Sequence, residues 1–221
     1  MTSSRGSNTA SPRDRNTRRR RETRAKLISA ARRLFARQGV DNTRINEITD
    51  EADVGFGSFY NHFKSKEEIV EAVLAETIAA QGAAVAAVTG DVEDPAQVVA
   101  TAHRHFVDLA RRDPDWGWLL VRLDATHNLI VKALGPFAER DIERGIKAGR
   151  FRVANRRVAM LGAGGALMAV MREVLEGRAP KDAGRLHAEG VLRLLGVPPE
   201  EAAEVARRPM PRFYDPQAQA S

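Results

Sequence analysis

The sequence predicts an all-α fold. Apolar residues recur along most of the 221 residues at the three- and four-residue spacing of amphipathic helices, and no segment alternates convincingly between polar and apolar residues. Helix punctuation also recurs: Gly39 and Gly149 stand at expected helix ends, and Pro95 stands at an expected first helical position. The length, without internal repeats, favours one or two domains of roughly 100–200 residues each.

The N-terminal part of the chain is expected to hold four helices. The first starts somewhere in residues 16–23 and runs to Gln38, the second follows a cap at Thr43, and the third is short and follows a turn at residues 53–55. Ser65-Lys66-Glu67-Glu68 has the pattern of a capping box that opens the fourth helix. The inward-facing residues of these four helices are expected to be Leu27, Ile28, Ala31, Leu34, Phe35, Ile45, Ile48, Ala52, Phe59, Phe63, Ile69, Val70, Val73, Leu74 and Ile78.

Residues 90–95, Gly-Asp-Val-Glu-Asp-Pro, are the best candidate for a domain boundary. Later helices are expected at about 95–111, 115–123, 125–148 with a break or kink at Pro136, 156–176, 182–195 and 200–207. The expected organisation is a disordered basic arm at 1–19, a compact domain at 20–80, a helical domain at 95–208 and a loose tail at 209–221.

The net charge of +6 is concentrated at one end of the chain. Residues 1–24 hold eight arginines and two acidic residues, so the other 197 residues hold 27 basic and 27 acidic residues and balance to zero. Arg18-Arg19-Arg20-Arg21 lies just ahead of the predicted first helix. Such an arm could follow DNA phosphates or enter a minor groove, or it could be a solvated tail that aids solubility.

Several classes of protein are excluded by composition. The chain has no cysteine, so it has no disulfide, no thiol nucleophile and no cysteine-based metal site. The start of the chain does not resemble a secretory signal, and the longest uncharged apolar stretch, residues 158–171, is shorter than the roughly 20 residues of a membrane span. From these two observations we expect a cytoplasmic protein without a membrane partner. No catalytic constellation, metal site or cofactor motif is present in the sequence, so we expect a protein that is not an enzyme and has no cofactor.

Residues 44–66, RINEITDEADVGFGSFYNHFKSK, predict a helix-turn-helix, a motif whose second helix enters the major groove of double-stranded DNA. Glycines let the backbone approach the bases, while an amide, hydroxyls and aromatic edges can contact bases or phosphates. Backbone N–H groups at helix starts favour phosphate. The predicted DNA-binding residues are Thr43, Arg44, Gly55, Phe56, Gly57, Ser58, Tyr60, Asn61, His62 and Lys66. The competing interpretation is a plain three-helix packing unit.

Residues 20–80 resemble the DNA-binding domain of TetR-family regulators. The matching residues are Phe35, Gly39, Thr43, Ile48, Ala52, Val54, the run Gly57-Ser58-Phe59-Tyr60-Asn61-His62-Phe63 and the run Ser65-Lys66-Glu67-Glu68. Three residues depart from the family pattern: Thr49 stands for alanine, Asp53 for the turn glycine and Gly55 for serine. The departures affect the exact base contacts more than the mode of binding. The resemblance implies a second, helical domain with a ligand pocket and a dimer interface formed by its last two long helices.

The second domain offers one independent argument for a homodimer. The helix expected at 156–176 is apolar on every side and carries Gly162, Gly164, Gly165 and Ala166, so a twin subunit could cover the face that the chain itself leaves open; a central helix in a monomer is the alternative. Candidate effector-binding residues, for each of which ordinary core or dimer packing is the favoured alternative, are Phe106, Trp116, Trp118, Arg122, His127, Phe137, Met168 and Met171. His103 and His105 fall on different helix faces, which argues against a shared metal.

Together these patterns predict a homodimeric DNA-binding regulator. The favoured form is a repressor that binds a palindromic operator and is released from it by an unknown small-molecule effector. One alternative is an effector-independent DNA-binding protein that is controlled by a protein partner. Another is an enzyme with an accessory DNA-binding module, which the absence of a catalytic constellation disfavours.

Overall fold

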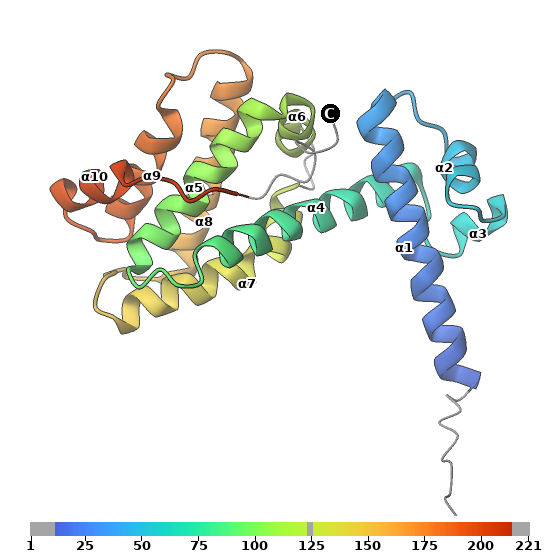
Figure 1. The fold of residues 1–221 in the computed structure, drawn as a ribbon, viewed down its shortest axis with the longest axis horizontal. Helices are drawn as coiled ribbons and strands as arrows, with labels where there is room; N and C mark the ends of the chain where they lie inside the picture. Colours follow the sequence, from blue (N-terminus) through green and yellow to red (C-terminus); the bar gives the residue numbers. More distant parts are fainter. Residues whose placement is uncertain (1–11, 123–125, 214–221) are drawn as a thin grey trace, which may run out of the picture. The chain divides into compact units, whose positions relative to one another are not determined.

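The computed structural model describes residues 12–122 and 126–213, and all regular structure within those ranges is helical, as the sequence predicts (Figure 1). The chain divides into two compact units, residues 1–73 and residues 74–221, which are called the first and the second unit below. Helix α4 (Lys66–Val88) begins in the first unit and continues into the second. Each unit has a hydrophobic core of its own.

The first unit consists of α1 (Pro12–Gln38), α2 (Ile45–Glu51), α3 (Phe56–Tyr60) and the first two turns of α4. Its core contains most of the residues that periodicity placed inward, and Phe59 and Phe63 are 0% and 1% exposed. Because α3 is only five residues long, burial of these two rings, rather than helix propensity, holds it in place.

Two expectations about helix starts are wrong. Helix α1 begins at Pro12, so residues 12–19 are helical and not part of a disordered arm; Pro12 suits a first helical position, and Arg18 pairs with Glu22 one turn later at 2.7 Å. Residues 1–11 lie outside the described part. Thr43 does not cap α2: Arg44 is the capping residue, and its backbone N–H donates to the Glu47 carboxylate at 2.7 Å. The Thr43 hydroxyl instead donates to the carbonyl of Gly39 at 2.7 Å.

The turns of the first unit follow from their sequence. Asp53 has φ of 53°, the left-handed conformation that the usual turn glycine of this motif adopts and that aspartate tolerates better than most residues. At the start of α4 the Glu68 backbone N–H donates to the Ser65 hydroxyl at 3.4 Å, as the capping box requires. The Glu68 carboxylate accepts from the backbone of Lys64, one residue earlier than the box predicts.

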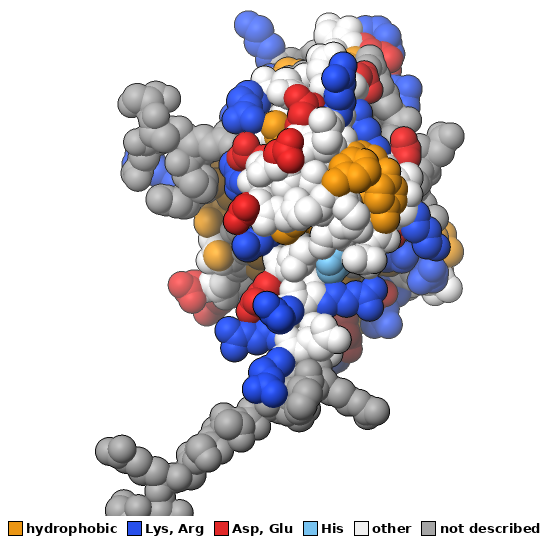
Figure 2. Space-filling view, turned by 90° about the vertical axis from the view of Figure 1, so that its right-hand side faces the viewer, with side chains coloured by type: hydrophobic (Ala, Val, Ile, Leu, Met, Phe, Trp, Pro, Cys, Tyr) orange, Lys and Arg blue, Asp and Glu red, His pale blue; other side chains and the backbone are white. Residues whose placement is uncertain are grey.

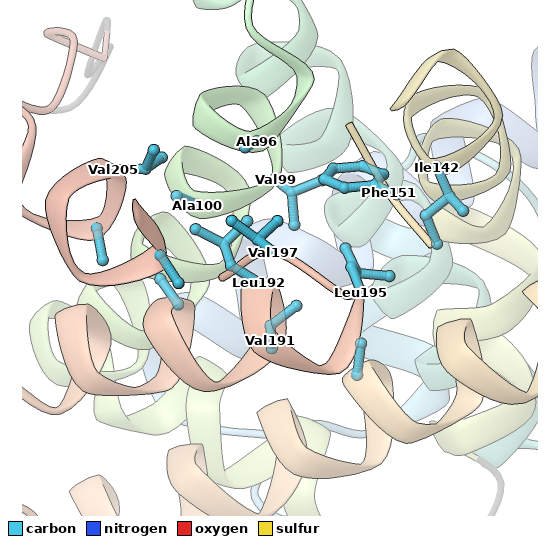
Figure 3. Packing of buried hydrophobic residues seen from close by; sticks show 14 of the residues in the cluster. Ala96, Val99, Ala100, Ile142, Phe151, Val191, Leu192, Leu195, Val197 and Val205 are labelled. Atoms are coloured by element: carbon cyan, nitrogen blue, oxygen red, sulfur yellow. The ribbon is translucent and has the colours of Figure 1, made fainter. Parts of the chain in front are cut away.

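Within its described residues the second unit contains the rest of α4 and six further helices, and each of the six follows a predicted segment closely. Their core is centred on α5, α8, α9 and α10; Leu192, Leu195 and Val197 pack against Val99 and Phe151 (Figure 3). The six are α5 (Pro95–Arg112), α6 (Pro114–Arg122), α7 (Thr126–Lys147), α8 (Arg156–Leu175), α9 (Ala183–Leu194) and α10 (Pro199–Arg207). Of the two outcomes expected at Pro136, a break or a kink, the break does not occur, because α7 runs through that residue.

Asp94 ties together three parts of the second unit. Its carboxylate caps α5 by accepting from the backbone of Ala96 at 3.0 Å, and it pairs with Arg150 at 2.9 Å and Arg208 at 2.9 Å. Burial opposes its charge, but the hydrogen bonds from Arg150, Ala96 and Arg208 outweigh that cost and hold the pKa of Asp94 below its ordinary value. The carboxylate is therefore ionised at neutral pH.

Helices α4 and α8 are long and apolar enough to cross a membrane by length and composition alone. Both helices also bury apolar side chains inside the protein. Helix α4, which spans the two units, buries Ile69, Leu74 and Ile78, and α8 of the second unit buries Leu167 and Met171. Apolar core helices pass the same test of length and hydropathy, so the test does not by itself indicate a membrane.

Candidate functional site

The outer edge of α3 is the first candidate site. Gly55, the N-cap, and Gly57 have open space where a side chain would begin, so the backbone here can approach a large ligand closely. Phe56 and Tyr60 are 53% and 52% exposed, and their rings meet edge to face at 5.7 Å. Figure 2 shows an exposed hydrophobic patch with a histidine nearby and basic side chains on either side. The accessibility of this edge disfavours the competing interpretation of these helices as a plain three-helix packing unit.

The polar side chains of this edge are available for contacts. Ser58 is half-buried and Asn61 is exposed, and the side chains of Ser58, Tyr60 and Asn61 make no hydrogen bond within the part of the chain that the structure describes. The Tyr60 ring is braced by a second edge contact, 5.4 Å from the buried ring of Phe59. A hydroxyl on a fixed ring, next to a free amide, is suited to contacts with base edges or phosphates.

Positive charge lies beside this edge. Arg20 on α1 reaches the carbonyl of Asn61, with 3.4 Å between its Nη2 and the oxygen, and the Arg24 guanidinium lies 5.1 Å from the centre of the Phe63 ring. Burial, reinforced by these two arginines, lowers the pKa of His62, which is half-buried. His62 is therefore mainly uncharged at pH 7 and offers hydrogen bonding rather than a charge.

The other predicted DNA-binding residues differ in their exposure. Arg44 is exposed at the start of α2, whereas the side chain of Thr43 is 1% exposed and faces inward. The Lys66 ammonium donates to the carbonyl of Asp41 at 3.3 Å, which leaves its charge and two further donors free. Thr43 therefore cannot present its hydroxyl to a phosphate in this conformation, and we remove it from the candidate contacts.

A cavity of about 120 Å³ in the second unit is the second candidate site. It lies between α4, α5, α7, α8 and α9, next to the core residues Val99, Ile142 and Leu195 of Figure 3. Its wall is mainly apolar, and the charged or titratable residues in the described part of that wall are His103, Arg140 and Asp141. An apolar enclosure with a few polar groups is the usual form of a small-molecule site.

Only part of the predicted effector-binding set lines this cavity. Phe106, Phe137 and Met168 are in its wall. Trp116 and Trp118 are not, although Trp116 stacks on Phe106 at 6.4 Å, and Met171 is 1% exposed in the interior of the unit without reaching the cavity. The side chains of Arg122 and His127 lie outside the described residues.

A pair of histidines was missed by the sequence reasoning. His103 on α5 and His187 on α9 lie with 2.9 Å between Nδ1 of the former and Nε2 of the latter. Burial lowers the pKa of His103 to about 3, helped by the neighbouring His187, and burial lowers the pKa of His187 to about 4. Both rings are therefore neutral at pH 7. They are separated by 84 positions, so no local sequence pattern indicates the pair.

A helix-turn-helix edge joined to a separate helical unit is the organisation of a DNA-binding regulator. Residues 27–73 match the family model for bacterial regulatory proteins of the tetR family, and residues 94–208 match a model for the tetracyclin repressor-like C-terminal domain. The second match alone covers more than half of the chain. The chain belongs to the TetR family and is a DNA-binding transcriptional regulator; members of this family are regulators, not enzymes.

Individual relatives agree with this assignment. The solved structure of RolR in complex with its ligand resorcinol is 36% identical, covers 90% of this chain and 100% of that chain, and superimposes with a TM-score of 0.80. The transcriptional repressor KstR2 of Mycolicibacterium smegmatis is 45% identical over 51 residues, and the regulator TtgR of Pseudomonas putida is 45% identical over 53. These two matches span 25% of each curated relative and about a quarter of this chain.

Proposed function

We propose that the protein is a repressor that binds a palindromic operator as a homodimer in the cytoplasm and leaves it when a small-molecule effector occupies the cavity of the second unit. The observation that carries the proposal is the accessible edge of α3, with two open glycines, two exposed aromatic rings and polar side chains without partners among the described residues. In the proposed complex this edge enters the major groove.

Within the groove we assign the contacts by chemistry. Asn61 and Ser58 face base edges, Phe56 offers an apolar edge to a thymine methyl group, and the Tyr60 hydroxyl binds a phosphate. Gly55 and Gly57 allow close approach, His62 hydrogen-bonds at the end of the helix, and Arg44 and Lys66 supply positive charge to phosphates on either side. Base contacts carry the sequence preference, whereas phosphate contacts set affinity and position.

An apolar stripe on the second unit supports the homodimer. On α8 the exposed residues include Val158, Gly162, Gly165 and Ala166, and Val158 is 66% exposed. On α9 the stripe continues with Leu186 and Leu194, which are 44% and 48% exposed. The two halves adjoin, because a side-chain carbon added at Gly162 would lie 3.4 Å from Leu194.

Small residues let helices approach closely, and an exposed apolar surface gains free energy when a second copy covers it. In the proposed dimer the recognition helices are related by a two-fold axis, and the operator half-sites are about 34–36 Å apart or a multiple of that.

Effector release requires that the small molecule binds the DNA-incompetent conformation more tightly, typically by about 1–3 kcal/mol. The cavity supports this mechanism over control by a protein partner, and RolR, with 36% identity, binds a small aromatic ligand. Helix α4 supplies Ile69 to the first core and Gly82 to the cavity wall, so one continuous helix connects the two sites.

The function is tested by selecting duplexes from a random pool and titrating the preferred duplex. We expect the selected sequences to contain an inverted repeat, and we expect small aromatic compounds that raise the melting temperature of the protein to reduce the shifted fraction. A direct contradiction of the dimer would be selection of a single asymmetric half-site. Compounds that bind but never change the shifted fraction would favour control by a protein partner.

Arg19, Arg20 and Arg21 of α1 are proposed to contact phosphates flanking the groove, since Arg20 reaches the carbonyl of Asn61 just after α3. We expect Arg19→Gln, Arg20→Gln and Arg21→Gln together to weaken binding to operator and random duplex alike. Each lost phosphate contact should flatten the slope of log affinity against log salt by about 0.9. Arg152→Gln with Arg157→Gln, exposed arginines of the second unit, is the control. An unaltered salt slope in the triple variant would show that these arginines only aid solubility.

A further inference from the structure

We propose that the cavity takes a neutral compound of one aromatic ring bearing a hydroxyl group, and that His103 selects this effector by a hydrogen bond. His187 contacts the His103 ring and holds that ring in position. This inference rests on the proposed function for the identity of the cavity as the effector site. It adds the chemical class of the ligand and the atom that recognises it.

The size and lining of the described cavity suit a ligand of one ring. Its volume is about 120 Å³, and an engineered apolar cavity of about 150 Å³ accommodates benzene. The rings of Phe106 and Phe137 and the thioethers of Met160 and Met168 provide polarisable walls. Gly82 sets one limit, because a side chain there would meet Leu134 at 2.9 Å and the Phe137 ring at 3.0 Å.

The polar groups of the wall favour a neutral ligand. Arg140 and Asp141 pair with each other, with 2.9 Å between Nη2 and Oδ1, so the guanidinium already has a counter-charge. Asp141 is the less exposed of the two, and its negative charge would repel a carboxylate ligand. His103, the third polar residue, carries no charge at neutral pH, because burial and its partner lower its pKa. Among the described residues of the wall, an aromatic acid would thus lack an unpaired cation.

His103 lines the cavity, and its pairing with His187 through Nδ1 leaves its other ring nitrogen for a ligand. A single N–H lies in the 2.9 Å contact, and it belongs to one ring or the other. His103 Nδ1 is therefore either the donor or the acceptor of this hydrogen bond. In neutral imidazole the two nitrogens have opposite roles. His103 Nε2, which has no partner among the described residues, is therefore a donor when His187 donates and an acceptor when His103 donates. A phenolic hydroxyl both donates and accepts, so it fits either arrangement.

The test is calorimetric titration of the full chain, without DNA, with phenol, toluene and benzoate. We expect phenol to bind about tenfold more tightly than toluene, the usual size of one buried hydrogen bond, and we expect no detectable binding of benzoate. His103→Leu should abolish the preference for phenol while leaving toluene binding unchanged, and His103→Gln, which retains a hydrogen-bonding group, should keep part of it. Equal binding of phenol and toluene to the unaltered protein would overturn the proposal.

The positioning role of His187 has its own readout. We expect His187→Leu to reduce the ratio of phenol to toluene affinity, and His187→Gln to restore it, whereas a purely structural role would weaken both ligands equally. The ¹⁵N shifts of the His103 ring should change on adding phenol and stay unchanged on adding toluene. His105→Gln, a buried histidine of the same helix outside the cavity wall, is the matched control and should leave the ratio unchanged.

Failure of this inference and failure of the proposed function give different results. Phenol that binds through His103 but leaves the operator complex intact supports the ligand site and contradicts the effector mechanism. Operator release by compounds whose affinity does not depend on His103 supports the mechanism and contradicts the assignment of His103. Should His103→Leu unfold, as its melting curve would show, the comparison rests on His103→Gln and on both His187 variants.

Discussion

Replacing Ser58 and Asn61 by alanine and Tyr60 by phenylalanine in one variant is expected to weaken operator binding by at least about 100-fold. Each good base contact contributes about 1–3 kcal/mol of discrimination, and each factor of ten in affinity corresponds to about 1.4 kcal/mol. Phenylalanine at position 60 keeps the edge contacts with Phe56 and Phe59, so the fold of the first unit should be unchanged. Fluorescence anisotropy at fixed salt, with the selected operator and a random duplex, measures the effect.

The single replacements separate the roles of the three residues. Tyr60→Phe should weaken both duplexes by the same factor, because a phosphate contact carries no sequence information. Ser58→Ala and Asn61→Ala should weaken the operator more than the random duplex and change which bases a selection recovers. If the triple variant retains full operator affinity while its melting temperature is unchanged, the assignment of this edge to the groove is wrong.

Gly145→Ala is expected to destabilise the second unit by about 3 kcal/mol, the upper end for overpacking a core. The added carbon would lie 2.0 Å from Cδ2 and 2.2 Å from Cε2 of Phe151, a ring that is 2% exposed. The ring cannot easily withdraw, because the backbone N–H groups of Arg150 and Phe151 both donate to the Gly145 carbonyl, at 2.8 and 3.1 Å. The helix preference of alanine offsets only about 1 kcal/mol.

Gly135→Ala is the matched control, since it lies in the same helix with open space at the position of the new carbon. We expect it to leave stability unchanged or to raise it by up to about 1 kcal/mol. Denaturant unfolding followed by tryptophan fluorescence is suitable, because both tryptophans, Trp116 and Trp118, belong to α6 of the second unit. Equal midpoints for the two variants would show that the Phe151 ring moves aside freely.

The first unit could be predicted well because its signals are local. Phe59 and Phe63 are spaced for one buried face, Gly39 ends α1 with φ of 81°, and Asp53 adopts the left-handed turn expected of it. Errors arose where several residues can serve equally. Thr43 looks like a cap, but its hydroxyl is satisfied by the preceding turn, so Arg44 takes that place. Pro136 signals a break or a kink, yet α7 runs through it without a break.

The second site could be predicted only in part, because residue type does not tell a cavity wall from a core. Met168 lines the cavity while Met171, one turn later, is buried away from it. The histidine pair depends on how α5 packs against α9, a contact between distant segments that periodicity cannot reveal. Helical spacing correctly separated His103 from His105, but the true neighbour of His103 is 84 positions away.

The carboxylate of Asp94 joins the first and last residues of the segment that matches the C-terminal family domain, since it pairs with Arg208 at 2.9 Å. The two ends of that segment are thus adjacent in space, as in domains that tolerate circular permutation. A short linker from 208 to 94, with new termini in an exposed loop, would therefore give a permuted module in which the packing of α5 to α10 can be studied apart from DNA, although without the part of the cavity wall that α4 supplies.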